Sequence, residues 1–113
     1  MMDISKRTYI KDAFEKKGEV ELFGWVHDIR DLSKIRFLIL RDITGRIQTI
    51  AIKGDASPEV FELIGKVPRE SVVRLKGELK DSKQAPGGKE VLVKDLELIA
   101  VAEVELGLGR SYP

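Results

Sequence analysis

Basic side chains that could bind phosphate are concentrated between His27 and Lys53. This segment holds three acidic residues and six basic ones. The basic residues are Arg30, Lys34, Arg36, Arg41, Arg46 and Lys53. By contrast, the stretch from Asp95 to Glu105 has four acidic residues and no basic one. The net charge of +1 therefore hides a localised basic region, which attracts phosphate whatever the total charge. A solvated surface of mixed charge explains the same pattern equally well.

An aromatic residue lies within this basic segment. If residues 35–42 form a strand, Leu38 and Leu40 share one face and Phe37 shares the other with Ile39 and Arg41. A Phe37 on the outer face, flanked by Arg36 and a neighbouring Gln48, would form a platform on which an unpaired base stacks. From the residues alone, a core aromatic is the more common explanation of Phe37.

Searching the chain for a catalytic set finds none. His27 is the only histidine and there is no cysteine, so a thiolate or histidine metal cluster has nothing to build on. Gly87-Gly88 lacks the strand–loop–helix context of a phosphate-binding loop. The acidic residues are scattered and select no catalytic pair. We expect the chain itself to be non-catalytic and to carry neither a metal nor a cofactor.

The composition limits the class of protein. A chain of 113 residues with 42% hydrophobic and 35% charged residues fits one globular domain. No run approaches 18 apolar residues, and the N-terminal segment lacks the apolar stretch of a secretory signal. The absence of cysteine suits a reducing cytoplasm, which is the expected location.

The elements that must position the basic segment can be placed from sequence patterns. A short amphipathic helix is expected over residues 5–16, with Ser5 as N-cap. Five β-rich segments follow, and Gly24 in the first predicts a bulge or a sharp coil. Ser57-Pro58-Glu59 predicts the start of a second helix, which should stop by Val67 because Pro68 follows. The predicted strands cover residues 19–30, 35–42, 46–53, 71–80 and 90–100.

Three strands, one helix and two further strands are the order of an OB-fold. The sequence therefore predicts an all-β domain with one inserted helix, a five-stranded Greek-key OB barrel with a short N-terminal helix. A small SH3-like barrel and an α+β sandwich also fit the order and length, but the position of the helix favours the OB-fold.

Five motifs resemble the N-terminal domain of aspartyl- and asparaginyl-tRNA synthetases. The similarity runs from about Arg7 to about Val104, and the motifs are specific as a set although each alone is weak. They are Gly24–Asp31, Phe37–Asp42, Thr44–Gln48, Arg69–Val73 and Ala85–Val91. In that family the domain binds the anticodon loop of its tRNA.

The resemblance implies roles for four residues. The family's anticodon-binding arginine, stacking aromatic, base-reading glutamine and acidic reader fall on Arg30, Phe37, Gln48 and Glu90. Aspartate and asparagine tRNAs share a central uracil, which the aromatic would stack on. Further RNA contacts are expected from His27, Lys34, Arg36, Arg46 and Gln84.

The resemblance also implies properties of a parent enzyme. Such an enzyme would be a homodimer that uses ATP and Mg²⁺ in a separate catalytic domain, whereas the isolated domain would be a monomer. Residues 28–32 and Arg7-Thr8 favour the aspartyl type of archaeal or eukaryotic kind, whereas Ala85–Gly88 occurs in both types and is common in asparaginyl enzymes.

Two departures from the family pattern bear on these expectations. Ser33 stands where the family has glycine, so the loop that it occupies is expected to bend differently. Residues 1–104 form the expected domain, and residues 105–113 read as a disordered tail in place of a proline-rich hinge. A truncated chain, a split paralogue and a free-standing module all fit this ending. The alternative functions are general binding of single-stranded nucleic acid and docking of a protein partner.

Overall fold

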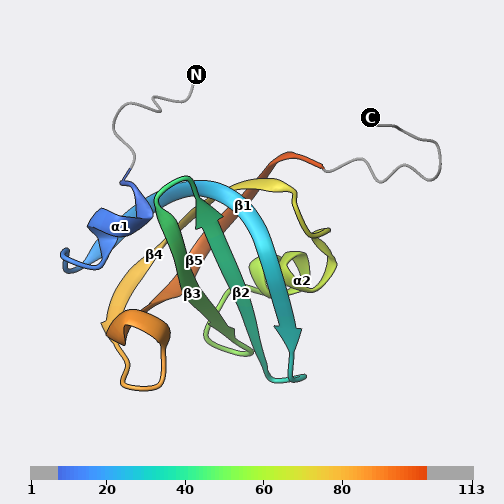
Figure 1. The fold of residues 1–113 in the computed structure, drawn as a ribbon. Helices are drawn as coiled ribbons and strands as arrows, with labels where there is room; N and C mark the ends of the chain where they lie inside the picture. The colour runs from blue at the N-terminus through green and yellow to red at the C-terminus, as the bar shows by residue number, and fades with distance from the viewer. Residues whose placement is uncertain (1–7, 102–113) are drawn as a thin grey trace.

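The computed structural model describes residues 8–101, and within them the chain forms a closed five-stranded barrel (Figure 1). The order of hydrogen-bonded strands is β1-β2-β3-β5-β4, with β3 and β5 parallel and the other neighbours antiparallel. The elements are α1 (Ile10–Ala13), β1 (Glu19–Asp31), β2 (Ile35–Asp42), β3 (Gly45–Ile52), α2 (Pro58–Lys66), β4 (Val72–Asp81), the 3-10 turn η2 (Pro86–Gly88) and β5 (Lys89–Ala100). The predicted OB-fold is confirmed, and each strand boundary lies within one residue of its expected position.

The barrel interior is filled by alternate residues of the strands. Leu38 and Leu40 are fully buried, as the alternation along β2 predicts, and the Thr49 hydroxyl donates a hydrogen bond to the Leu38 carbonyl inside the barrel, at 2.8 Å. The largest buried side chains include Ile10, Leu22, Val26, Leu38, Leu40, Ile47, Ile64, Val73, Leu75, Val91 and Val93.

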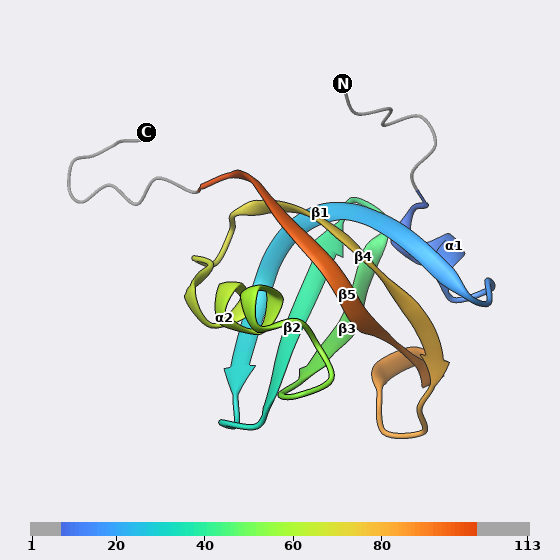
Figure 2. The same ribbon diagram turned by 180° about the vertical axis from the view of Figure 1, so that it is seen from behind.

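Helix α2 closes one end of the barrel, where it contacts β1, β2, β3 and β5 (Figure 2). It begins as predicted, because the Ser57 hydroxyl accepts a hydrogen bond from the Val60 backbone N–H at 3.2 Å. Its apolar stripe of Val60, Phe61 and Ile64 is buried against the barrel. The expected helix is therefore confirmed in its position, between Ser57 and Val67.

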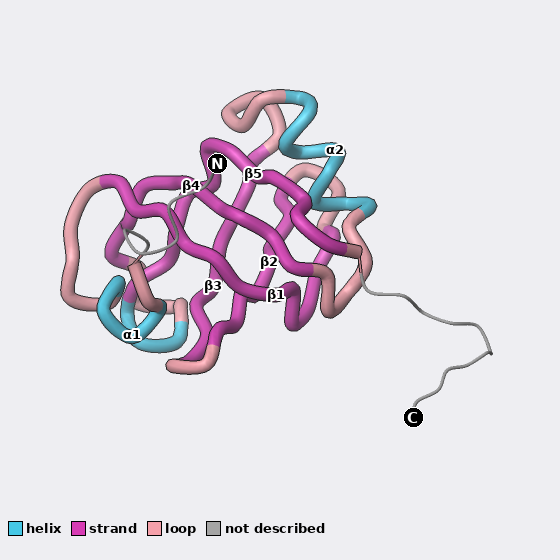
Figure 3. The backbone as a smooth tube through the Cα atoms, turned by 90° about the horizontal axis from the view of Figure 1, so that it is seen from above, coloured by secondary structure: helices cyan, strands magenta, loops and turns pink. Residues whose placement is uncertain are grey.

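Helix α1 lies on the other side of the barrel from α2 (Figure 3) and is shorter than predicted. It spans only residues 10–13, and the expected cap Ser5 lies outside the described residues. The carboxylate of Asp42 accepts a hydrogen bond from the Ile10 backbone N–H at 2.9 Å. A distant side chain therefore fixes the start of this helix, and the exposed run of residues 15–19 gives it no apolar surface on which to continue.

Two glycines allow neighbouring strands to approach closely. A Cβ on Gly24 would lie 2.3 Å from the Arg41 carbonyl oxygen of β2, and one on Gly77 would lie 2.3 Å from that of Leu92 in β5. The bulge in β1 lies three residues beyond Gly24, at His27, where the register with β2 shifts. This bulge turns His27 outward onto the face described next.

Candidate nucleic-acid interface

The outer face of β1, β2 and β3 carries most of the residues expected to bind RNA. Along one strand, every second side chain points to the same side of the sheet, and residues that are directly opposite on neighbouring strands point to the same side as each other. Cross-strand partners therefore form rows on this face. Arg30 of β1 is opposite Phe37 of β2, and Ile39 is opposite Gln48 of β3. One further pair along, Arg41 is opposite Arg46. The barrel therefore converts separate sequence motifs into one continuous surface.

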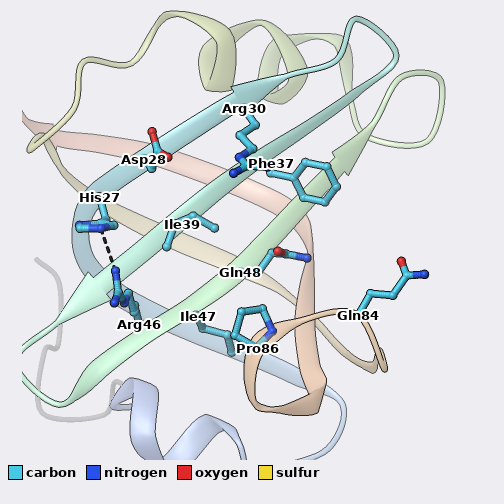
Figure 4. Close-up of a pocket in the computed structure, with 10 residues that line it drawn as sticks. All are labelled: His27, Asp28, Arg30, Phe37, Ile39, Arg46, Ile47, Gln48, Gln84 and Pro86. Carbon is cyan, nitrogen blue, oxygen red and sulfur yellow. Dashed lines mark hydrogen bonds between the residues drawn. The ribbon is translucent and has the colours of Figure 1, made fainter.

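A pocket of about 590 Å³ opens on this face (Figure 4). Its floor is formed by outer side chains of β1, β2 and β3 together with the buried Ile47, and Gln84 and Pro86 of the loop between β4 and β5 form a further wall. The lining residues are His27, Asp28, Arg30, Phe37, Ile39, Arg46, Ile47, Gln48, Gln84 and Pro86. An open apolar floor with polar groups at its rim suits a planar, partly polar ligand such as a nucleobase.

Phe37 stands on the outer face of the barrel and is half-buried. It lines the pocket next to Arg30, its partner across the strands, and the ring projects over the pocket in Figure 4. The core interpretation of Phe37 is therefore wrong, because Leu38 and Leu40 take the inward positions of β2. An aromatic ring at this place can stack on a base.

Gln48 is held in a defined orientation by Glu90. Its side-chain N–H₂ donates a hydrogen bond to the Glu90 carboxylate at 2.9 Å, across the parallel pairing of β3 and β5. This contact turns the amide oxygen of Gln48 into the group that can accept from a ligand. Glu90 is thus connected to the pocket through Gln48.

His27 and Arg46 meet at the opposite end of the pocket from Phe37 (Figure 4). The guanidinium Nη1 of Arg46 lies 2.9 Å from Nε2 of His27. A guanidinium can only donate, so His27 accepts at Nε2 in this arrangement. The contact fixes both side chains at the rim.

Asp28 is the one carboxylate that lines the pocket, and a basic residue compensates its charge. An oxygen of Asp28 lies 2.7 Å from Nη2 of Arg69, which precedes β4. Sequence reasoning missed Asp28, Ile39, Ile47 and Pro86 as lining residues. Ile39 shares the parity of Phe37, so alternation was the signal that could have found it.

Arg36 and Lys34 do not line the pocket. Arg36 was expected beside Phe37, and the structure corrects this: its guanidinium lies under α2, 4.4 Å from the centre of the Phe61 ring, and donates to the Phe61 carbonyl at 2.7 Å. Its Nε is 3.2 Å from the Asp31 carboxylate. The physical reason is parity, because Arg36 shares the inward side with Leu38. Lys34 is exposed in the loop between β1 and β2.

The loop that contains Ser33 keeps a conformation that favours glycine. Ser33 has a φ of +75°, and its backbone N–H donates to the Asp31 carboxylate at 2.9 Å. Ser33, which stands at the position of the family's glycine, thus adopts the left-handed backbone conformation that favours glycine. The expected tail at residues 105–113 lies outside the described residues.

Within residues 8–101, no group of three or more histidine, cysteine, aspartate and glutamate side chains is arranged to hold a metal ion. Over the same range, no helix has the length and apolar character needed to cross a membrane.

Comparison with known proteins identifies the family. The pattern that defines OB-fold nucleic acid binding domains of the tRNA anticodon type matches residues 20–99. The chain belongs to this family. The anticodon-binding OB-fold domain is 40% identical over 106 residues to the aspartate–tRNA(Asp/Asn) ligase of Methanopyrus kandleri, a match that covers 88% of this chain and 25% of the ligase. It is 44% identical over 105 residues to the corresponding ligase of Haloferax volcanii, covering 93% of this chain and 24% of that one.

A solved structure shows the same relationship. The domain matches asparaginyl-tRNA synthetase from Pyrococcus horikoshii with a TM-score of 0.78 and 37% identity, over 86% of this chain and 24% of the synthetase. The domain therefore spans about a quarter of the length of the ligases that it matches. It is an N-terminal anticodon-binding domain of the aspartyl/asparaginyl-tRNA synthetase type.

Proposed function

We propose that the pocket on β1, β2 and β3 binds the anticodon loop of an aspartate or asparagine tRNA. The observation that carries this proposal is Phe37, an aromatic residue held on the outside of the barrel and at the edge of an open pocket. A large apolar ring in that position has no packing role inside the barrel. It suits a ligand with a flat apolar surface, which an unstacked base provides.

Each of four side chains has a distinct part in this proposal. The central uracil stacks on Phe37, and Gln48 accepts from an N–H on the uracil edge while Glu90 holds its amide in place. The cationic Arg30, opposite Phe37, contacts a phosphate or stacks its guanidinium plane on a neighbouring base. Shape and stacking bind the loop, and the hydrogen bond to Gln48 adds base preference.

Lys34 has a lesser part in the proposed function. It is exposed in the β1–β2 loop and contributes general attraction to phosphate instead of a contact in the pocket. Gln84, at the tip of the other wall, can meet a nucleotide that flanks the uracil (Figure 4). Arg36 is omitted from the RNA-binding set because it is engaged with α2.

We further propose that the whole protein is an aspartate–tRNA ligase, with the asparagine ligase as the alternative. The relatives from Methanopyrus and Haloferax support the aspartate type. In such a protein a separate catalytic domain supplies ATP and Mg²⁺ chemistry, the enzyme acts as a homodimer in the cytoplasm, and this domain alone is a monomer without ligase activity.

Three substitutions at one position test the proposed stacking role. Phe37→Tyr keeps a ring, Phe37→Leu keeps apolar bulk without a ring, and Phe37→Ala removes both. Affinity is measured on an anticodon stem-loop with a central uracil, and folding by the melting temperature. Loss of a stacked base costs about 1–3 kcal/mol, so Leu and Ala should weaken binding roughly 5- to 150-fold while Tyr binds like the parent.

The Phe37→Leu variant is the decisive one, because it should remain folded. If it binds the stem-loop as tightly as the parent, Phe37 does not stack a base. A second arm replaces the central uracil by cytosine in the same stem-loop. Equal affinity of the parent for both loops would reduce the function to general binding of single-stranded nucleic acid.

A further inference from the structure

The arginines that the structure describes divide into two groups by their partners. Arg36, Arg69 and Arg74 each lie within 3.2 Å of a carboxylate oxygen. The other arginines within residues 8–101 form no ion pair, and all of them lie on the outer face of β1, β2 and β3: Arg30, Arg41 and Arg46. The arginines without an ion pair are therefore concentrated on one side of the barrel.

Arg41 and Arg46 are direct partners across β2 and β3. Side chains at such positions leave the sheet about 5 Å apart and on the same face. Two like charges placed opposite one another destabilise a sheet, and both side chains are exposed. A shared anion would convert this unfavourable pair into a favourable one, because each guanidinium can donate to phosphate oxygens.

Neighbouring side chains hold each of the two guanidinium groups in place. That of Arg41 lies over the indole of Trp25, 5.9 Å from the ring centre, and that of Arg46 is bonded to His27. Neither Trp25 nor His27 is an anion, so these contacts orient the two charges without neutralising them.

We propose that Arg41 and Arg46 form a clamp for an RNA phosphodiester, separate from the base-binding end of the pocket. The clamp rests on the proposed function, since the same strand would place its base on Phe37. Arg41 is four residues from Phe37 along β2, about 13 Å at the rise of a β-strand. Nucleotides that flank the stacked base would thus cross Ile39 and reach the clamp.

A phosphate clamp and a base reader differ in what their removal changes. Phosphate contacts add affinity for every sequence and increase the salt dependence, whereas base contacts add preference. Removing the clamp should therefore weaken the binding of all RNA loops alike. It should leave the ratio of affinities for the uracil and cytosine loops unchanged.

The test compares the parent with the double variant Arg41→Gln/Arg46→Gln, and uses Lys76→Gln as the control. Lys76 is an exposed cation on β4, so the control removes one charge from another side of the barrel. At about 0.15 M salt we expect the double variant to bind both loops about 5- to 30-fold more weakly. The slope of log affinity against log salt should become shallower by about 0.7–0.9, the value for one lost phosphate contact.

The single variants refine the result. If both arginines hold one phosphate, each single change lowers affinity but retains part of the slope, since the remaining guanidinium still neutralises the phosphate. Melting temperatures no lower than that of Lys76→Gln establish that the variants are folded.

The outcomes separate the clamp from the proposed function. A folded double variant with the affinity and slope of Lys76→Gln overturns the clamp, whatever Phe37 does. If the double variant loses affinity as expected while Phe37→Leu and the change of the central base have no effect, that result supports the clamp and rejects the anticodon pocket. A parent that binds neither loop overturns both.

Discussion

Two sides of the same barrel differ in whether their arginines are paired with carboxylates. On β1, β4 and β5, Arg74 is bonded to Glu97, Glu21 and Asp95 at 2.9, 2.9 and 2.8 Å. The hydrogen bond that Arg74 donates to Glu97, with those that it donates to Asp95 and Glu21, raises the pKa of Arg74 above its ordinary value. On the outer face of β1, β2 and β3, Arg30, Arg41 and Arg46 form no ion pair within the described residues, and Arg30 and Arg46 line a pocket.

The arginine of the first side stabilises the barrel, whereas the arginines of the second side are available to bind a ligand. Three carboxylates on two strands neutralise Arg74, so its bonds join β1, β4 and β5 and leave no excess positive charge for RNA. Arg30, Arg41 and Arg46 contribute less to the fold, because within the described range they bind no carboxylate. Substitutions on the two sides should therefore act on different properties, stability on one and binding on the other.

The largest expected effect is a loss of unfolding free energy when either of two strand glycines is replaced. Gly24→Ala and Gly77→Ala each place a methyl group on a backbone carbonyl oxygen of the adjacent strand. Overpacking of this kind costs about 1–3 kcal/mol of unfolding free energy. Urea unfolding measures this loss of free energy. Gly54→Ala is unsuitable as a control, because Gly54 has a positive φ. Gly24 and Gly77 variants as stable as the parent would show that the strands can separate freely.

The second effect concerns Arg74 itself. Arg74→Met keeps an apolar stem but leaves Glu21, Asp95 and Glu97 without their shared cation. We expect a loss of about 1–2 kcal/mol, larger than for an isolated surface pair because three contacts are lost together. Thermal unfolding and RNA titration should be compared. A clear loss of RNA affinity in a folded Arg74→Met would remove the distinction between the two sides.

A smaller effect, opposite in sign, is expected at Ser33. Ser33→Gly relieves the left-handed backbone at φ +75° in the loop that joins β1 and β2. The gain should be about 0.5–1 kcal/mol, or several degrees in melting temperature for a domain of this size. Calorimetry measures the gain. A lower melting temperature would mean that the serine has a stabilising role that outweighs the strain.

The smallest effect is a pH dependence at Asp31. The Arg36 guanidinium beside it, followed by the hydrogen bond from the Ser33 backbone N–H, lowers the pKa of the Asp31 carboxyl below its ordinary 3.8. A lowered folded-state pKa stabilises the protein above the ordinary value, and this contribution is lost as the pH falls through the folded-state value. Asp31→Asn should thus be slightly less stable than the parent at pH 7, and the difference should shrink as the pH falls below 3.8 and through the lowered folded-state pKa. A constant difference across that range would contradict this.

Local patterns were enough to predict the barrel. Alternation assigned Leu38 and Leu40 to the interior, and Ser57-Pro58 marked the start of α2. The same parity places Arg36 with Leu38, yet its charge suggested an RNA contact. Its actual position depends on α2, where Gly65 leaves room for the guanidinium, and no local pattern reports that contact.

Features that depend on distant strands were not predictable from the residues. The bond between Gln48 and Glu90 requires the parallel pairing of β3 with β5, and their roles came only from family resemblance. The short α1 depends on Asp42, 32 residues further along the chain than Ile10. The opposed arginines require the register of the β2–β3 hairpin, in which Asp42 is opposite Gly45.

The proposed function requires that RNA binds on the outer face of β1, β2 and β3 and not on the side that carries Arg74. Titration of the ¹⁵N-labelled domain with an anticodon stem-loop, followed by two-dimensional NMR, tests it most directly. We expect the amide signals of Arg30, Phe37, Arg46 and Gln48 to shift in a saturable way, while those around Arg74 and Asp95 stay in place. Shifts concentrated around Arg74, with the signals of Phe37 and Gln48 unchanged, would contradict it.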